Sequence, residues 1–213
     1  MFQGLDAPTI ISRILTLLIA FTIHELSHAV TADRLGDDTA RRLGRISLNP
    51  LVHLDPIGSL LLIFAGFGWA KPVPVNPYNL RNGPQMGMAV VAAAGPISNF
   101  LMALIGAIPF RLGLLPFRAI GPLGGFLPSP SQFFLDFIEI NLLLMLFNLI
   151  PIAPLDGSKI LRGFAPRSWE PILATLEQWG PFLLLALVFL GGGILGAILG
   201  PPLNFLYRVI LGV

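Results

Sequence analysis

The chain has 213 residues, of which 54% are hydrophobic and only 11% are charged, and its formal net charge is +2. An average soluble domain has about 25% charged residues, so this composition indicates a membrane protein. The small net charge and the scattering of basic residues through loops argue against nucleic-acid binding. Cysteine is absent, which excludes disulfides and thiolate metal sites and leaves His, Asp and Glu as candidate metal ligands.

Four apolar runs are long enough to cross a membrane as helices, which takes about 20 residues. They cover residues 7–32, 85–110, 131–151 and 178–199. A fifth run at 57–69 is shorter and interrupted by glycine, so we expect a re-entrant segment or half-helix there. The predicted fold class is an all-α polytopic membrane protein, with four to five transmembrane helices plus a re-entrant or extended segment in a single domain over residues 1–213.

Two segments outside these runs have predictable local structure. The closely spaced prolines of the segment 71–77 exclude a helix and favour an extended or polyproline chain. The residues after Pro201 and Pro202 are expected to form a short amphipathic or interfacial piece. The start of the chain lacks the basic stretch of a secretory signal, so we expect the first apolar run to be retained as a membrane span.

The basic residues predict how the chain is oriented in the membrane. If 57–69 does not cross, the loops at 33–56, 68–84 and 152–177 lie on one side. These loops hold nine of the thirteen Lys and Arg residues. Because basic loops remain on the cytoplasmic side, this side is predicted to face the cytoplasm.

The first apolar run ends in the pattern HELSH, which contains two of the three histidines in the chain. His24 and His28 are four residues apart, so on a helix both imidazoles share one face and can bind one metal ion. Glu25 lies beside them, where it can act on a metal-bound water. Ionisable residues at membrane depth are costly and indicate a functional site, which favours a metal centre over a chance pair of histidines.

A catalytic zinc ion usually takes three protein ligands and leaves one position for water. Asp156 is the favoured third ligand, because the helix before it ends on the same side of the membrane as the first helix. Asp136 and Glu139 are about 20 Å from that end at the rise of a helix. His53 is a weaker alternative, and Asp156 can also be read as a turn residue before Gly157. The full set of candidates is His53, Asp136, Glu139, Asp156, Glu170 and Glu177.

Three motifs in order resemble those of the site-2 protease family, which are intramembrane zinc metalloproteases. They are HELSH at 24–28, GPISN at 95–99 and NLIPIAPLDG at 148–157. The segment GWAKPVPVNP at 68–77 resembles the small bacterial and archaeal members that lack PDZ and CBS domains. The resemblance covers the chain from the first apolar run to about Gly163.

This resemblance implies an endopeptidase that binds one Zn²⁺ ion and cleaves transmembrane protein substrates within the lipid bilayer. It also implies a multi-pass protein of the prokaryotic cell membrane, with its active site toward the cytoplasmic side. From the residues alone, Asn99 and Asn148 are equally well explained as hydrogen-bonding groups between helices. The implied site is zinc ligands His24, His28 and Asp156, general base Glu25, and substrate-binding residues Asn99 and Asn148.

Two other classes of function are compatible with metal-binding residues in a membrane. A membrane metal transporter fits less well, because Glu25 is suited to activating water and the sequence shows no pair of inverted halves. A non-catalytic membrane scaffold is disfavoured because every residue of the predicted metal and base set is present. No pattern in the sequence indicates an oligomeric state.

Overall fold

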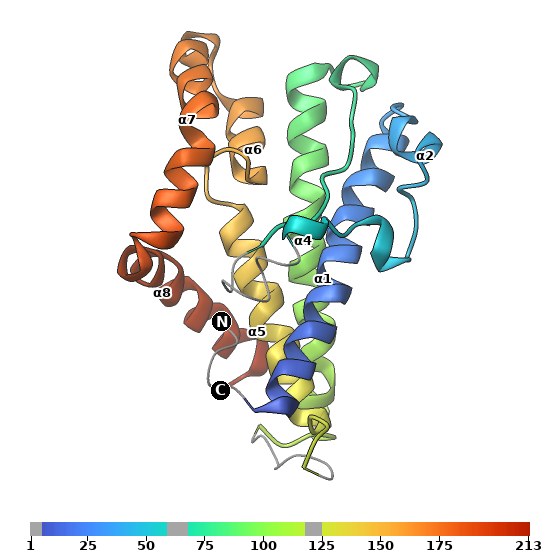
Figure 1. Cartoon of the computed structure of the whole chain (residues 1–213), viewed down its shortest axis with the longest axis vertical. Helices are drawn as coiled ribbons and strands as arrows, with labels where there is room; N and C mark the ends of the chain where they lie inside the picture. The colour runs from blue at the N-terminus through green and yellow to red at the C-terminus, as the bar shows by residue number, and fades with distance from the viewer. Residues whose placement is uncertain (1–5, 59–67, 118–124) are drawn as a thin grey trace.

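The fold is seen in a computed structural model that describes residues 6–58, 68–117 and 125–213 (Figure 1). Every regular element in these ranges is a helix, and Leu54 and Ala70 form an isolated antiparallel bridge. This confirms the predicted all-α fold. The α-helices are α1 (Ala7–Arg34), α2 (Thr39–Arg42), α4 (Pro84–Arg111), α5 (Pro130–Asn148), α6 (Asp156–Phe164), α7 (Glu170–Phe189) and α8 (Gly192–Leu211), and the short 3₁₀ turns are η1 (Pro50–Val52), η2 (Pro77–Asn79) and η3 (Arg167–Trp169).

Five helices among the described residues are long and apolar enough to cross a membrane. They are α1, α4, α5, α7 with the turn before it, and α8. The chain is therefore a multi-pass membrane protein, as its composition indicates.

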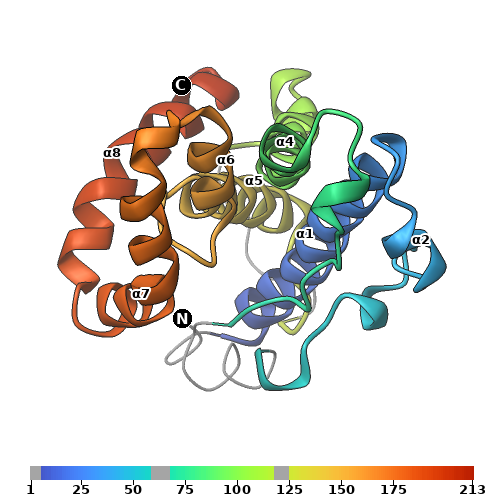
Figure 2. The same ribbon diagram turned by 90° about the horizontal axis from the view of Figure 1, so that it is seen from above.

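Helix α4 packs against α1, α5 and α6 (Figure 2). Small residues on α4, Ala103 and Ala107, allow close packing against Ile138 and Leu142 of α5, and all four side chains are buried. Helix α8 packs across α4 and α5, and its C-terminal carbonyls accept hydrogen bonds from Arg111. His24 and His28 of α1 thus lie beside a helix, α4, that is itself packed against several others.

The connection from α1 to α4 begins and ends at the same end of the molecule (Figure 1). The main-chain N–H of Arg81 donates to the carbonyl of Leu35 at 2.8 Å, which closes the connection. The buried carboxylate of Asp37 accepts hydrogen bonds from the main-chain N–H of Asn76 at 2.7 Å and the side chain of Asn79 at 3.0 Å. Burial alone would raise the pKa of Asp37, but these bonds and those from Thr39 hold it below its usual value.

A small apolar cluster lies between the three central helices. Ala20 of α1, Met102 of α4 and Phe137 of α5 are buried against one another. Ile23, Phe133 and Leu144 pack around this cluster. It lies one helical turn from His24 along α1, on the side away from the end where α1 stops.

The predicted spans at 7–32, 85–110 and 131–151 correspond to α1, α4 and α5, whereas the predicted span at 178–199 is wrong in its bounds. The chain leaves the helix at Leu190 and Gly191, which separates α7 from α8. The apolar run continues through this break, so hydropathy could not locate it; glycine, a poor helix former, stands there. Pro201 and Pro202, predicted to precede a separate piece, lie inside α8. Of the predicted half-helix at 57–69, residues 59–67 lie outside the described residues, and it stays a prediction.

Candidate metal centre

Three buried side chains from opposite parts of the chain meet where α1 faces the start of α6. The Nε2 atoms of His24 and His28 are 3.0 Å apart, and each lies 3.2 Å from Oδ2 of Asp156. Their exposed fractions are 6%, 7% and 6%. Among the described residues this is the one group of three or more His, Asp or Glu side chains that can hold a metal ion. The structure therefore brings together the three residues that the sequence favoured.

The second nitrogen of each imidazole has its own partner on α4. Nδ1 of His24 lies 2.6 Å from the side-chain oxygen of Asn99, and Nδ1 of His28 lies 2.7 Å from the main-chain carbonyl of Val91. Both partners are acceptors, so each Nδ1 carries the proton and donates it. Each Nε2 then has a lone pair directed at the other ring and at the Asp156 carboxylate. Three acceptors in such close contact form a site that is suited to a cation.

The spacing of these atoms fits zinc. Zinc binds imidazole nitrogen and carboxylate oxygen at about 2.0–2.2 Å, which at tetrahedral angles separates the ligand atoms by about 3.3 Å. The observed separations are 3.0 and 3.2 Å. Oδ2 of Asp156 is buried and accepts no hydrogen bond from the described residues. Zinc binds a deprotonated carboxylate, so Oδ2 is the Asp156 atom that is available to ligate the ion.

Gly95 of α4 provides the space that the imidazoles occupy. A Cβ atom at this position would lie 2.5 Å from Cε1 of His24 and 2.5 Å from Nε2 of His28. Any residue with a side chain would therefore fill the centre itself. The absence of a Cβ is what allows the α4 backbone to approach the metal-binding face of α1 so closely.

Glu25 follows His24 directly on α1 and lies beside this centre. Its exposed fraction is 8%, and it makes no hydrogen bond to any described residue. It interacts electrostatically with Arg45. Burial lowers the pKa of Arg45, and the charge of Glu25 counteracts that shift. The buried Arg45 guanidinium donates to the main-chain carbonyls of Lys71 and Pro72 at 2.5 and 2.9 Å.

The other candidates for the third ligand do not join the group. His53 is fully buried, and its Nε2 lies 2.8 Å from the main-chain carbonyl of Ser47, to which it donates. Glu170 and Glu177 both form ion pairs with Arg162. Asp136 and Glu139 lie on α5 and are not part of the group.

The two asparagines predicted to bind substrate differ in their surroundings. The amide of Asn99 is fully buried and occupied at both ends, by His24 and by Asn141. Contact with a substrate would cost one of these bonds. Asn148, the last residue of α5, is half-buried; its side-chain nitrogen donates to Leu144 of its own helix at 3.0 Å, and its oxygen has no partner among the described residues. Substrate binding by either residue stays a prediction.

Two residues of the centre were not singled out from the sequence. Gly95 stands in the GPISN motif, but its contact with the imidazoles depends on how α1 and α4 pack. Asn141 is fully buried, and its oxygen accepts a hydrogen bond from Asn99 at 3.0 Å. The sequence did offer a signal for Asn141, because a polar residue in an apolar span often has a specific hydrogen-bond partner on a neighbouring helix.

Comparison with known proteins gives several relatives. The chain is 42% identical over 184 residues to "Putative zinc metalloprotease YwhC" of Bacillus subtilis (strain 168), covering 85% of this chain and 83% of that protein. It is 29% identical over 181 residues to Rip2 of Mycolicibacterium smegmatis, covering 80% of this chain and 64% of Rip2, and 26% identical over 155 residues to MJ0611 of Methanocaldococcus jannaschii, covering 72% and 67%. The latter two have the same descriptive name. No family model and no solved structure matches the chain.

Proposed function

This chain belongs to the family of zinc metalloproteases that includes YwhC, and we propose that it is an intramembrane endopeptidase of the site-2 type. Its substrates are then transmembrane proteins, whose peptide bonds it hydrolyses in regulated intramembrane proteolysis. One observation carries the proposal: Asp156 meets His24 and His28 beside Glu25, and these last three residues lie on a helix apolar enough to cross a membrane. Ionisable groups in such helices are costly unless they serve a function.

In this proposal, His24, His28 and Asp156 hold one Zn²⁺ ion. When bound, zinc supplies Lewis acidity, which polarises a peptide carbonyl and lowers the pKa of a coordinated water toward neutrality. Glu25 is the general base: it accepts the proton of the attacking water and delivers it to the leaving amine. Asn99 and the main-chain carbonyl of Val91 keep the two imidazoles in the orientation that ligation needs.

The active site is proposed to open toward the cytoplasm. The end of α1, the start of α4 and helix α6 all lie at one end of the molecule (Figure 1). The loops at 33–56, 68–84 and 152–177, which hold nine of the thirteen basic residues, connect to this end. The positive-inside rule supports placing it at the cytoplasmic face, and from there water can reach a site within the bilayer.

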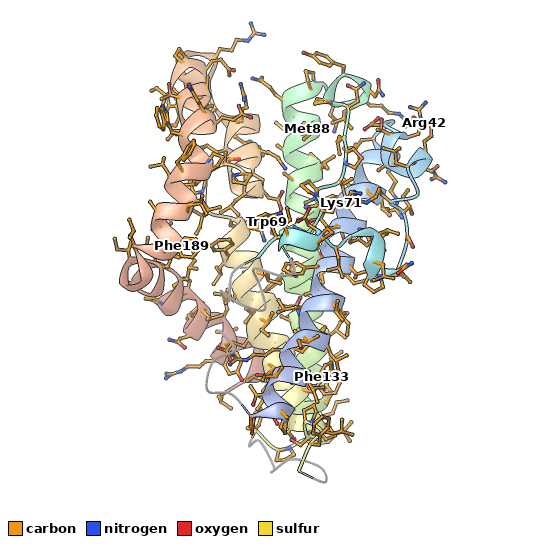
Figure 3. The ribbon with its side chains drawn as sticks, in the orientation of Figure 1. Arg42, Trp69, Lys71, Met88, Phe133 and Phe189 are labelled. Atoms are coloured by element: carbon orange, nitrogen blue, oxygen red, sulfur yellow. The ribbon has the colours of Figure 1, made fainter. Side chains whose placement is uncertain are left out.

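We also propose that the extended segment at 71–76 binds the unwound substrate as an added strand. The segment is fixed at both ends: Lys71 donates to the His53 carbonyl at 2.7 Å, and Asn76 donates to Asp37. Figure 3 places Trp69 and Lys71 midway along the molecule, beside the central helices and below Met88 of α4. Between the fixed ends, the main-chain groups of Val73 and Val75 make no hydrogen bond to any described residue. In an extended chain these two residues face the same edge, which offers two donors and two acceptors to a peptide.

Replacing Val73 with Pro tests this docking edge. The change removes one N–H donor where the neighbouring prolines already hold the chain extended. One hydrogen bond is worth about 1 kcal/mol, so KM for a peptide substrate is expected to rise about fivefold with kcat within about twofold. Pro74→Ala, which alters the opposite edge, is the matched control and should leave KM unchanged. Equal KM values for Val73→Pro and the wild type would exclude pairing at this edge.

Removing the metal tests the proposed function itself. The purified full chain is reconstituted in vesicles with a single-span model substrate, and cleavage is followed before and after treatment with a chelator. Chelation should reduce cleavage to background, and adding back one equivalent of Zn²⁺ should restore it, because the centre has one set of three ligands. Zinc flux in the same vesicles without cleavage would instead indicate a transporter, and zinc binding with neither activity a scaffold.

A further inference from the structure

A continuous series of hydrogen bonds connects His24 of the candidate metal centre to side chains on helices α4 and α5. Nδ1 of His24 lies 2.6 Å from the oxygen of Asn99 in α4, and the nitrogen of Asn99 lies 3.0 Å from the oxygen of Asn141 in α5. The nitrogen of Asn141 donates to the main-chain carbonyl of Phe137 at 2.8 Å. Both asparagines are fully buried, so water does not compete for these bonds.

The main-chain carbonyl of Phe137 determines which way each side-chain amide in this series is oriented. A main-chain carbonyl only accepts, so Asn141 turns its NH₂ group toward Phe137 and its oxygen toward Asn99. Asn99 must then turn its own NH₂ group toward Asn141 and its oxygen toward His24. Because that oxygen also only accepts, the proton of His24 is held on Nδ1, and Nε2 keeps the lone pair that faces Asp156.

We infer that Asn141 is a positioning residue for the zinc centre, which acts through Asn99 to keep His24 in the tautomer that binds the ion. The inference rests on the proposed function only in taking His24 as a zinc ligand. Without the Asn141 oxygen, the buried NH₂ group of Asn99 has no acceptor, and the Asn99 amide is free to rotate. A rotated amide presents NH₂ to His24, which favours the tautomer with the proton on Nε2, where it blocks ligation.

The two imidazoles differ in how their orientation is maintained. Nδ1 of His28 donates to the main-chain carbonyl of Val91, which cannot rotate within helix α4. His24 depends instead on two side-chain amides in succession. Loss of Asn141 is therefore expected to affect one ligand and spare the other. Outer partners of metal-binding histidines typically contribute about 10- to 100-fold to metal affinity.

Zinc affinity of Asn141→Leu is the first measurement. The solubilised full chain is titrated with Zn²⁺ in competition with a chromogenic chelator, and the variant is expected to bind zinc about 10- to 100-fold more weakly than the wild type. Asn99→Leu should show a comparable loss, and the double variant should be within about twofold of Asn99→Leu alone, because both act through one series of hydrogen bonds. Asn204→Leu, an exposed asparagine of α8 with no partner among the described residues, is the matched control and should bind zinc normally.

The tautomer of His24 is the second measurement, and a purely structural role of Asn141 would not change it. The chain has three histidines, so nitrogen-15 NMR of the metal-free protein at a pH where imidazoles are neutral can resolve each ring. In the wild type, His24 and His28 should carry the proton on Nδ1, whereas His53, which donates to Ser47 through Nε2, is an internal reference for the other tautomer. In Asn141→Leu the His24 signal should shift toward the His53 type while His28 stays unchanged.

Wild-type zinc affinity in Asn141→Leu would overturn the inference, as would weaker binding with the His24 tautomer unchanged. A failure of the protease proposal would give a different combination of results from a failure of the role inferred for Asn141. If the wild type binds zinc but does not cleave, and Asn141→Leu shows both the affinity loss and the tautomer shift, the protease proposal fails and the role of Asn141 stands.

Discussion

Glu25→Gln is expected to lower the rate of peptide hydrolysis by at least about 100-fold while zinc affinity stays within about twofold of the wild type. General acid–base catalysis typically contributes about 10²- to 10⁴-fold, and glutamine cannot accept the proton of the attacking water. Glu25 bonds to no described residue and is not one of the three grouped side chains, so the change should leave the centre intact. Single-turnover cleavage and chelator competition on the same preparation measure the two quantities.

Glu139→Gln is the matched control for this variant. Glu139 is an exposed residue on the face of α5 opposite Asn141, and it is not one of the grouped side chains, so the rate of hydrolysis of this variant should equal that of the wild type. Retained proteolysis by zinc-loaded Glu25→Gln would assign the base to another group. Loss of zinc together with activity would instead make Glu25 part of the binding site.

Gly95→Ala is expected to lose zinc affinity by about 100-fold or more with the helical fold retained. The added methyl group would lie 2.5 Å from atoms of both imidazoles, so at least one ring must move out of the ligand position. The loss of zinc affinity should therefore be at least as large as the largest losses, about 100-fold, that follow removal of residues hydrogen-bonded to metal ligands. Chelator competition measures the affinity, and circular dichroism verifies the helix content.

Gly196→Ala in α8 separates this packing effect from the general consequence of adding a methyl group to a transmembrane helix. A Cβ at Gly196 meets no atom within 4 Å, so that variant should bind zinc and cleave substrate as the wild type does. If Gly95→Ala also binds zinc normally, α1 and α4 are farther apart in the active protein, and Gly95 does not set the space for the ligands.

The pairing of His24 with His28 was predictable because it depends on helix geometry alone. A spacing of four residues places two side chains on one face of any α-helix, whatever packs against it. Asp156 could be favoured because spans alternate direction through a membrane, so counting spans indicates which helix ends share a side. The structure places that carboxylate 3.2 Å from both imidazoles.

The break between α7 and α8 and the roles of Gly95 and Asn141 could not be predicted in the same way. Leu190 and Gly191 interrupt the helix within a run that stays apolar throughout, so hydropathy contains no boundary there. The role of Gly95 depends on the distance between two helix axes, which is a property of tertiary packing. Asn141 was recognisable as a polar residue in an apolar span, but its link to His24 requires knowing that α4 and α5 are neighbours.

The buried cluster of Ala20, Met102 and Phe137 has a consequence for the cell's energy supply. These residues lie about one helical turn beyond His24, Asn99 and Asn141 respectively, toward the opposite end of the molecule. A hydrated cavity that continued across the bilayer would conduct protons and dissipate the electrochemical gradient. Packed hydrocarbon at this level excludes water, so under the proposed function water for hydrolysis would enter from one face while the membrane stays impermeable to ions.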